Sequence, residues 1–505
     1  MRKLACVLAL FVCVPSLAVD TKAFDAVFAA FDKNDVPGCA AGIVHGGKVL
    51  YGRGYGMASL EHSVPINADT VFDVGSVSKE FTAALVLLLE QQKKLSLDDD
   101  VRKYVPELPD YGTPITLRHL LHHTSGLRDY NDLLLFAEFH EEDLATDADA
   151  LRILAKQKRL NFTPGTDFSY SNTGYFLLSQ VIKRASGKSM RDFAQEQLFA
   201  PLGMTSTTMF DDHRMVIPHR ATAYAPRQRG GWAVAMSNWE QLGDGGVQTT
   251  LNDFAKWEAN FDEPKVGGKA LIDALLARTT LANGVSPTYA RGLNVDTFRG
   301  EPRVGHNGAW AGYRASFMRF PRLGQSIVIL CNRADTGGML GEKTAALVVT
   351  KPEETKPKAA GTPAAPLAGW YVDPLSGNVV RVREESGQFF AGPLKLEANG
   401  AVWRSGPRTF RFHDDAVDVA DNGPAHTLRR AAPFDPSRLA DYTGRYTSDE
   451  IGHPIDIVRK GEMLVLRTDR DEEIPLQPIA RDLFGGPAIL EFQRDAAGKV
   501  TGLTV

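Results

Sequence analysis

The sequence predicts an α+β domain followed by an all-β region. Two features of the first 350 residues indicate the α+β class: strand patterns stand near both ends, and helical patterns fill the middle between them. After a proline-rich segment the pattern changes to short alternating strands with closely spaced turn residues. At 505 residues the chain is longer than a single hydrophobic core usually accommodates, so we expect a large domain and one or two smaller ones.

The first 18 residues have the pattern of an export signal. Arg2-Lys3 precedes an apolar run from Leu4 to Val14, and the small residues of Ser16-Leu17-Ala18 suit cleavage by a signal peptidase. The run is too short for a comfortable membrane span, so an uncleaved anchor is the less favoured alternative. We therefore expect a signal peptide over residues 1–18 and a secreted or periplasmic mature protein without a transmembrane span.

Composition limits the class of partner. A net charge of −4 with 23% charged residues describes an ordinary soluble surface, and the absence of a basic stripe argues against nucleic acid. Removal of the signal leaves two cysteines, Cys39 and Cys331. Two thiols exclude a disulfide-rich scaffold, and the sequence leaves open whether they pair. It also leaves the oligomeric state open.

The predicted first domain covers residues 19–350. Val36 to Gly56 alternates turn glycines with short apolar runs and predicts a hairpin, whereas Phe81 to Leu89 is apolar on every side and predicts a buried helix. Helical patterns follow at Thr116–Leu121, Ala148–Lys158 and Gly174–Phe199, and strand patterns return at Gly312–Phe320 and Ser326–Cys331. We expect an antiparallel sheet whose edges come from both ends of the domain, flanked by helices, with a helical subdomain inserted.

The second part of the chain begins with a linker over residues 351–366, which has four prolines and no large apolar side chain. Two similar β segments follow, at 367–435 and 436–505: the stretch beginning "LAGWYVDPLSG" at Leu367 is echoed by "LADYTGRYTSD" at Leu439. Such a repeat predicts two similar β-barrels or two halves of one. The lengths do not decide between these alternatives.

A candidate nucleophile lies in the stretch "VFDVGSVSKEF", which contains the only Ser-x-x-Lys of the chain, Ser76 to Lys79. About one such match is expected by chance in a chain of this length, so Ser76 is also readable as a helix cap. The context favours chemistry, because the i, i+3 spacing puts both side chains on one helix face. A serine at a helix N-terminus also has its alkoxide favoured by the helix dipole, and a lysine that loses hydration can become a neutral proton acceptor.

Two further motifs also favour a catalytic site. Tyr170-x-Asn172 stands on a turn, where Tyr170 can relay a proton and Asn172 can offer its amide to a substrate carbonyl. His306-x-Gly308 stands in a short strand of small residues that includes Ala309, and small residues allow a substrate backbone to lie against a strand edge. Taken alone, Tyr170 is more simply a turn tyrosine packed on a helix.

In this order the three motifs resemble those of the serine β-lactamase and penicillin-binding-protein superfamily. The spacing resembles the class C β-lactamase-like branch, which also holds DD-peptidases, D-aminopeptidases and esterases. Further stretches match that pattern over roughly residues 21–349: "ITLRHLLHHTSGL", "PGTDFSYSNTGYFLLSQVI", "APLGMTST" and "GDGGVQTTLNDFAKW". Several motifs in one order are far more specific than any one of them. The resemblance implies a β-lactamase/transpeptidase-like fold, with a lipocalin-like β-barrel region after it.

The resemblance also implies roles. Ser76 would be acylated, Lys79 and Tyr170 would share general-base and general-acid duty, and Asn172 would hold the substrate amide. The backbone N–H groups of Ser76 and Ala309 would form the oxyanion hole, with His306 and Gly308 beside the substrate. No cofactor and no metal are implied. His119, His122 and His123 lack a carboxylate at the spacing of a zinc helix, so we interpret them as structural.

One departure from the resemblance bears on substrate. The third motif usually starts with lysine in β-lactamases and DD-peptidases, whereas His306 is mostly neutral near pH 7. We therefore predict an exported serine hydrolase that acts through an acyl-enzyme on small peptides or amides, D-amino-acid-containing ones included, as D-aminopeptidases do. An esterase and a class C-like β-lactamase are the alternatives on the same serine, and a penicillin-recognising binding protein is the non-catalytic one.

The D-aminopeptidase pattern includes a C-terminal loop that brings an acid to the substrate's amino group. An acidic turn formed by Asp469, Asp471, Glu472 and Glu473 is a candidate for this loop. Charge runs are usually solvated hairpins, and we favour that alternative. Whether the C-terminal barrels reach the active site stays open at this stage.

Overall fold

The computed structural model describes residues 20–336, 339–349, 364–373, 379–392, 394–405, 408–421, 425–469, 473–486 and 489–504. The predicted signal peptide and most of the predicted linker, residues 351–363, lie outside this part of the chain, as do Asp471 and Glu472 of the acidic turn. None of the described helices is both long enough and apolar enough to cross a membrane.

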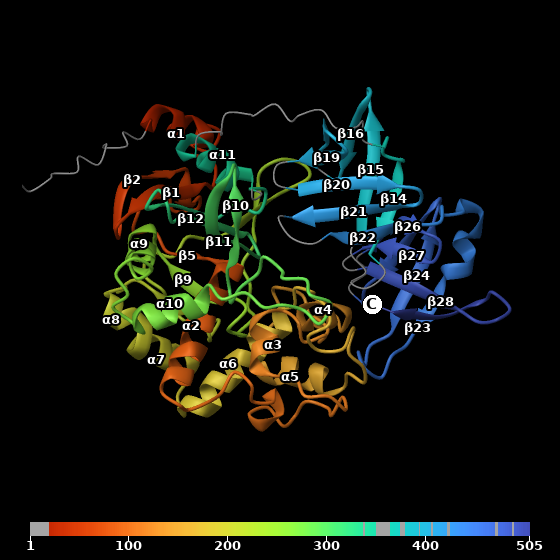
Figure 1. Ribbon diagram of the computed structural model, residues 1–505, viewed down its shortest axis with the longest axis horizontal. Helices are drawn as coiled ribbons and strands as arrows, with labels where there is room; N and C mark the ends of the chain where they lie inside the picture. The colour runs from red at the N-terminus through yellow and green to blue at the C-terminus, as the bar shows by residue number, and fades with distance from the viewer. Residues whose placement is uncertain are drawn as a thin grey trace, which may run out of the picture.

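A six-stranded antiparallel sheet forms the centre of the first domain (Figure 1). In spatial order its strands are β10 (Asn294–Phe298), β11 (Glu301–Trp310), β12 (Tyr313–Phe320), β13 (Gln325–Cys331), β1 (Cys39–His45) and β2 (Lys48–Tyr55). The N-terminal hairpin therefore supplies one edge and the late strands supply the other, as predicted. The hairpin turns at Gly46 and Gly47, whose φ angles of 54° and 75° favour glycine.

Helices cover both faces of this sheet. Alternation along β1 sends Ala41 and Ile43 to the face covered by α1 (Thr21–Phe28) and α11 (Met339–Val348), whereas Ala40 and Val44 join the core on the opposite face. Helix α9 (Leu251–Ala259) packs on that opposite face. Since both faces are covered there, the central strands β1 and β13 are buried along almost their whole length.

The helical part lies below the sheet in Figure 1 and starts from the buried helix α2 (Ser78–Gln91). The other helices are η1 (Gly75–Val77), η2 (Val101–Lys103), α3 (Leu117–Leu121), α4 (Tyr130–Phe136), α5 (Asp147–Ala155), α6 (Asn172–Ser186), α7 (Met190–Ala194), the π-helical η3 (Gln195–Phe199), α8 (Ala200–Leu202) and α10 (Gly268–Leu275). The helical pattern predicted from Gly174 to Phe199 is broken once, because Gly187 takes a φ of 72° and the side chain of Ser189 caps α7.

Short strands join the helical part to the sheet. They form three small sheets: β3 (Met57–Ser59) with β4 (Val64–Pro65), β5 (Phe72–Asp73) with β9 (Val247–Thr249) and β6 (Thr208–Met209), and β7 (Tyr224–Pro226) with β8 (Trp232–Val234). Strand β5 leads directly into η1 and α2, so pairing of β5 with β9 fixes the start of α2 against the "GDGGVQTT" stretch.

The C-terminal region forms two separate, nearly closed antiparallel sheets, which answers the question of one barrel or two. The first is ordered β17 (Leu394–Lys395), β16 (Gln388–Ala391), β15 (Val379–Glu385), β14 (Gly369–Val372), β22 (His426–Arg430), β21 (Ala416–Asp421), β20 (Arg408–His413), β19 (Val402–Ser405) and β18 (Glu397–Asn399). Its edge strands β17 and β18 are separated by Leu396 alone, so the sheet must curl round until its edges meet.

The second sheet is a meander that continues from η4 (Pro436–Tyr442). It runs in chain order through β23 (Gly444–Tyr446), β24 (Ile455–Lys460), β25 (Met463–Arg467), β26 (Glu473–Ala480), β27 (Leu483–Gly485), β28 (Ile489–Arg494) and β29 (Val500–Thr504). Each barrel has its own hydrophobic core.

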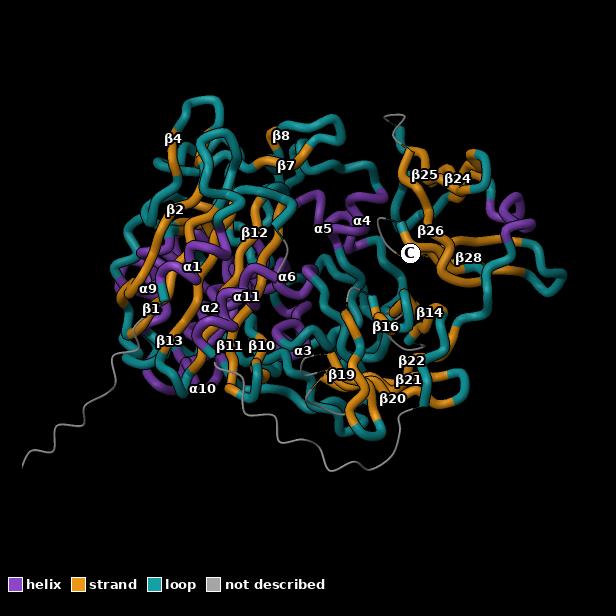
Figure 2. The backbone as a smooth tube through the Cα atoms, turned by 90° about the horizontal axis from the view of Figure 1, so that it is seen from above, coloured by secondary structure: helices purple, strands orange, loops and turns teal. Residues whose placement is uncertain are grey.

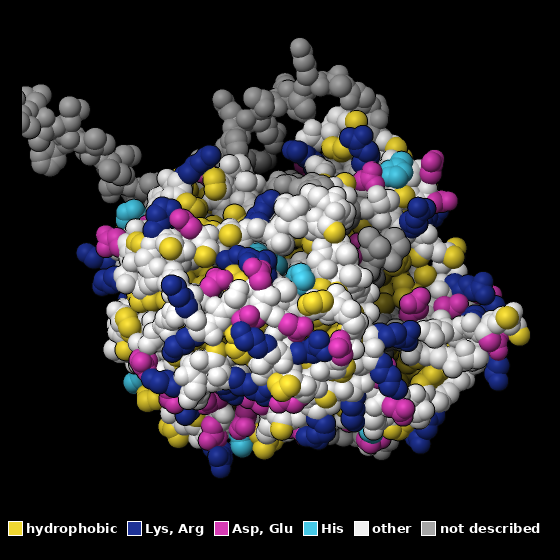
Figure 3. All heavy atoms as spheres, turned by 60° about the horizontal axis from the view of Figure 1, so that its bottom comes forward, with side chains coloured by type: hydrophobic (Ala, Val, Ile, Leu, Met, Phe, Trp, Pro, Cys, Tyr) yellow, Lys and Arg dark blue, Asp and Glu magenta, His cyan; other side chains and the backbone are white. Residues whose placement is uncertain are grey.

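The second barrel docks on the helical part of the first domain. Glu450 forms an ion pair with Arg128, its carbonyl accepts a hydrogen bond from Gln157 (3.1 Å), and Phe136 of α4 joins the barrel's core. Figure 2 shows α4 and α5 on the side of the domain that faces the C-terminal strands. Basic and acidic side chains alternate over the surface seen in Figure 3, without a large region of one sign.

Candidate active site

Ser76 lies in η1, at the junction of β5 and α2. Asp73 holds this junction, because its carboxylate accepts hydrogen bonds from the N–H of Gly75 (2.7 Å) and from Nε2 of Gln248 (2.5 Å). Gly75 has a φ of 51°, and a Cβ there would lie 2.7 Å from the backbone nitrogen of Ala309. Only glycine fits at this point, and its small size lets β11 approach the serine.

Lys79 is fully buried on the first turn of α2, one turn beyond Ser76. Its Nζ makes three polar contacts: with Oγ of Ser76 (3.1 Å), Oδ1 of Asn172 (2.9 Å) and the carbonyl of Asp244 (2.8 Å). Two of these partners are carbonyl oxygens, which can only accept. These two carbonyls fix Nζ through two of its N–H bonds, and the remaining position of Nζ faces Oγ of Ser76.

Tyr170 and Asn172 stand at the start of α6. The Nζ of Lys79 lies 5.0 Å from the centroid of the Tyr170 ring, and 39% of Tyr170 is exposed. Asn172 is fixed at both ends, since its N–H donates to Asp129 (2.5 Å) while its side chain accepts from Lys79. The motif therefore presents one solvent-accessible phenol and one anchored amide to the serine.

Strand β11 supplies His306, Gly308 and Ala309. A Cβ at Gly308 would lie 1.9 Å from the carbonyl of Val74 and 3.2 Å from the backbone nitrogen of Ser76, so the strand runs directly against the serine loop. Burial lowers the pKa of His306 to about 4, with the charge of Lys79 adding to the effect. A neutral imidazole therefore stands where a cation would serve a substrate carboxylate.

Two cavities meet at Ser76 and Ala309. The first, of about 160 Å³, includes Asn172 in its lining and is named the Asn172 cavity; the second, of about 400 Å³, includes Tyr170 and His306 and is named the Tyr170 cavity. Other residues line the Asn172 cavity alone: Asp73, Gly75, Tyr130, Asn131, Phe210, Trp239, Gln241, Asp244, Gly245, Gly246 and Trp310. The structure thus brings the other six predicted site residues together around Ser76.

Several groups at the site are not evident from the sequence. Asp129 is the acceptor for the Asn172 N–H, and burial raises its pKa. The carboxylate oxygens of Asp244 accept a hydrogen bond from the hydroxyl of Tyr130, at 3.1 Å from Oδ2 and 3.2 Å from Oδ1, and burial raises the pKa of Asp244 to about 7. Asp244 lies within the quoted "GDGGVQTT" stretch, which is the signal that could have drawn attention to it. Nothing in the local sequence marks Asp129 as more than a helix cap.

The three histidines before the "TSG" turn are neutral and bonded within the protein. His119 caps α3, His122 accepts from Nε of Arg291 (3.3 Å), and His123 accepts from the N–H of Ser171 (3.2 Å). Burial lowers the pKa of all three. The structural role of His123 extends to the site, because its ring lies 4.2 Å from that of Tyr170.

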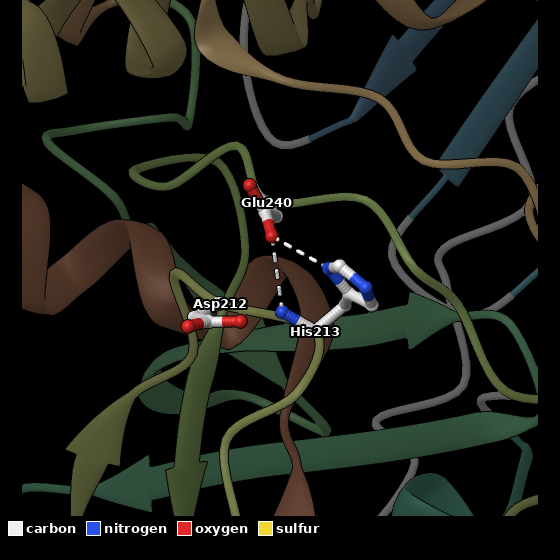
Figure 4. Close-up of side chains that lie close together, drawn as sticks. All are labelled: Asp212, His213 and Glu240. Carbon is white, nitrogen blue, oxygen red and sulfur yellow. Dashed lines mark hydrogen bonds and ion pairs between the residues drawn. The ribbon is translucent and has the colours of Figure 1, made fainter.

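Among the residues that the structure describes, one group of side chains has the spacing of metal ligands, namely Asp212, His213 and Glu240. In Figure 4 the ring and the backbone N–H of His213 both bond to Glu240 (2.7 and 3.1 Å). Asp212 is held by Arg214, whose hydrogen bonds lower the pKa of that carboxyl to about 2. These mutual contacts account for the cluster, and we assign it no ligand.

Cys39 and Cys331, whose pairing the sequence leaves open, form a disulfide. They are direct partners across β1 and β13. The acidic turn lies on the second barrel: Asp469 bonds to His453 (2.8 Å), and Glu473 pairs with Lys460. Neither acid lines the two cavities, and the N–H of Asp469 donates a hydrogen bond to Glu138 of the first domain (3.1 Å).

Comparisons with known proteins agree with the geometry of a serine hydrolase site. A family model described as beta-lactamase matches residues 24–351. A D-aminopeptidase of Brucella melitensis biotype 2 is 27% identical over 499 residues, which cover 93% of each chain. A D-aminopeptidase of Brucella anthropi is 27% identical over 516 residues, which cover 96% of each chain.

Solved structures support the fold. The octameric penicillin-binding protein homologue from Pyrococcus abyssi has a TM-score of 0.60 at 22% identity, covering 81% of this chain and all of its own. The D-amino acid amidase from Ochrobactrum anthropi SV3 has a TM-score of 0.54 at 20% identity, covering 65% of this chain and 98% of its own. With a family model that matches well over half of its length, the chain belongs to the β-lactamase family and is a serine hydrolase.

Proposed function

We propose that this chain hydrolyses short peptides or amides with a D-amino acid on the acyl side, through an acyl-enzyme on Ser76. The D-aminopeptidases that match it over nearly their whole length support this substrate class. A single observation carries the chemistry: Nζ of Lys79 faces Oγ of Ser76 at 3.1 Å while two carbonyl oxygens fix its other positions.

In acylation, neutral Lys79 takes the hydroxyl proton of Ser76 as Oγ bonds to the substrate carbonyl carbon. The carbonyl oxygen becomes an oxyanion between the N–H groups of Ser76 and Ala309, which lie on the closely packed η1 and β11. When the scissile C–N bond breaks, the departing nitrogen takes a proton from Tyr170, which is re-protonated by the Lys79 ammonium. In deacylation a water oxygen bonds to the ester carbon, and Lys79 and Tyr170 pass the proton of that water to Oγ of Ser76 as the C–Oγ bond breaks. The carboxylic acid product leaves, and the hydroxyl of Ser76 is restored.

Neutral His306 favours a peptide, amide or ester over a β-lactam. A β-lactam carries a carboxylate that a fixed cation near the third motif would bind. The lowered pKa of His306 leaves that side chain uncharged near pH 7. An esterase or class C-like β-lactamase on the same serine is the second candidate. A purely binding role is disfavoured, because a binding module has no need for a buried lysine aimed at a serine.

We also propose that the protein is exported. The N-terminal signal pattern supports this, and so does the disulfide between Cys39 and Cys331, since such bonds persist in oxidising compartments. Mass spectrometry of the N-terminus of the periplasmic and secreted fractions tests it. A mature chain that begins near Val19 is expected, and protein retained in the cytoplasm with residues 1–18 would contradict it.

A fluorophosphonate probe tests the nucleophile. Wild-type protein should be labelled on Ser76, and Ser76→Ala should abolish labelling while the melting temperature stays close to that of wild type. A panel of D-aminoacyl p-nitroanilides, their L-enantiomers, p-nitrophenyl esters and nitrocefin then ranks the substrate classes. Folded wild-type protein that resists the probe would overturn the proposed chemistry, and turnover of nitrocefin alone would overturn the substrate class.

A further inference from the structure

The two cavities can be assigned to the two halves of a substrate. Both contain Ser76 and Ala309, so the scissile carbonyl lies where they meet. The departing nitrogen must lie near the group that protonates it, and Tyr170 lines only the second cavity. The Tyr170 cavity therefore receives the leaving group, and the Asn172 cavity receives the acyl group, whose amide or side chain meets Asn172.

An acid with spare hydrogen-bonding capacity lines the acyl side. Asp73 and Asp244 both line the Asn172 cavity. The oxygens of Asp73 already accept hydrogen bonds from the N–H of Gly75 and from Nε2 of Gln248. Asp244 is 7% exposed, and Tyr130 is the side-chain donor it meets among the described residues. A carboxylate can accept about four hydrogen bonds, so Asp244 has room for an ammonium group. Burial raises its pKa to about 7, and the neighbouring Lys79 opposes this shift, so a second cation at the carboxylate would lower the pKa further.

A cation lines the leaving-group side. Arg314 on β12 is the direct cross-strand partner of Ala309, so its side chain is on the face of the sheet that carries Ala309. It lines the Tyr170 cavity, and its hydrogen bonds to the carbonyls of Ala311 (2.8 Å) and Tyr313 (2.6 Å) both use Nη1. Two acids lie near Arg314, namely Glu141 and Asp335, and Asp335 is held by Arg333 at 2.7 and 2.8 Å. Arg314 can therefore offer Nε and Nη2 to a carboxylate.

We propose that this active site recognises both ends of a short peptide: Asp244 binds the ammonium group of the acyl residue, and Arg314 binds the carboxylate of the leaving residue. The inference rests on the proposed function and narrows its substrates to dipeptides and similarly short peptides with both ends free. Arg314 stands at a different position from His306, since Arg314 pairs with Ala309 and His306 pairs with Phe317.

The experiment compares three matched peptides on the full-length protein: D-alanyl-D-alanine, its N-acetyl form and its C-terminal amide. Wild type should prefer the free dipeptide over each capped form by about 10- to 100-fold in kcat/KM, the usual range for a buried charged hydrogen bond. Asp244→Asn, which keeps an acceptor for Tyr130, should bring the free-to-acetyl ratio close to one. Arg314→Gln should do the same for the acid-to-amide ratio, and Arg322→Gln on the exposed β12–β13 turn is the control.

Each variant should change only its own ratio. A ratio of two substrates on one protein is unaffected by a general loss of activity, and comparing that ratio between variant and wild type removes the effect of the cap's size. Ratios that stay at wild-type values in folded Asp244→Asn or Arg314→Gln protein would overturn the corresponding half of the inference. Equal turnover of free and capped peptides by wild type would overturn both halves, yet leave the proposed hydrolase intact. Failure of the fluorophosphonate to label Ser76 is a separate result, which refutes the proposed function itself.

Discussion

Lys79 and Glu80 are adjacent and fully buried, the first with a basic and the second with an acidic side chain, yet they face different surroundings. Lys79 meets three polar partners, whereas Glu80 is enclosed and its carboxylate oxygens have no hydrogen-bond partner by geometry among the described residues. One side chain is thus placed for proton transfer, and the other is expected to be neutral. This difference follows from rotation by about 100° around a helix between neighbouring residues.

Replacement of Lys79 tests the proton acceptor. Lys79→Arg keeps a positive charge, but a guanidinium does not become neutral in a protein. We expect the rate of Ser76 acylation to fall by about 10²- to 10⁴-fold, the usual contribution of a general base. The measurement is the second-order rate of fluorophosphonate labelling, and a rate within threefold of wild type would show that the amine is not the base.

Replacement of Glu80 tests the effect of burial on stability. Burial raises the pKa of Glu80 well above 4.5, so its stability contribution is fully present below pH 4.5 and declines as pH rises toward the folded-state pKa. Each pH unit in that window costs about 1.4 kcal/mol. Glu80→Gln should therefore be more stable than wild type near pH 8 and similar near pH 4. Urea unfolding at both values checks this, and an equal difference at both would contradict it.

At the scale of elements, the site depends on the contact between η1 and β11. Val74 and Gly75 lie against Gly308 and Ala309 so closely that neither glycine can accept a side chain. The two proposed oxyanion N–H groups come from the two sides of this contact. Their spacing is therefore fixed by backbone packing rather than by any side chain.

Gly308→Ala should separate these elements. A Cβ 1.9 Å from the carbonyl of Val74 forces a shift of β11, and overpacking of this kind costs about 1–3 kcal/mol of stability. We expect kcat/KM for any substrate to fall by about 10²-fold or more, as for loss of one oxyanion donor. Gly502→Ala on β29, where the nearest contact is 3.3 Å away, is the control for a strand glycine. Wild-type kinetics in Gly308→Ala would contradict the assignment.

The elements were predictable where local pattern decides them. The hairpin, α2, β12 and β13 lie where the sequence predicts them, because alternation and apolar runs mark buried strands and helices. The motifs also predicted the seven site residues that the fold brings together. Asp129 and Asp244 were not singled out, since their position at the site depends on contacts between segments far apart in the chain, such as Asn172 with Asp129 and Tyr130 with Asp244. Arg314 was not singled out either, because its place beside Ala309 depends on the register of the β11–β12 pair.

At the scale of the molecule, the second barrel is linked to the site through one short path. Glu450 pairs with Arg128, and the neighbouring Asp129 holds the backbone of Asn172, which in turn contacts Lys79. Both members of the ion pair are mostly buried, at 15% and 18% side-chain exposure. The barrel is therefore placed to affect how Asn172 is held.

Glu450→Gln tests this path, with Asp449→Asn as its matched control. Removing one partner of a largely buried pair leaves the charge of Arg128 uncompensated, so we expect the free energy of unfolding to fall by about 1–3 kcal/mol. We also expect KM to rise more for a peptide than for a small ester. Asp449 is 96% exposed and lies 3.8 Å from Lys158, so its loss should cost under about 1 kcal/mol. Urea unfolding and substrate kinetics measure both effects, and equal behaviour of the two variants would show that the barrel does not act through Arg128.

The disulfide has a consequence for how the protein survives damage. It joins residues 292 positions apart, and every proposed site residue lies inside the covalent ring that it closes. A single cut by a protease at a surface loop within that ring therefore leaves one molecule, with both pieces still paired across β1 and β13. Such nicked protein would run as intact on a non-reducing gel and as two fragments after reduction.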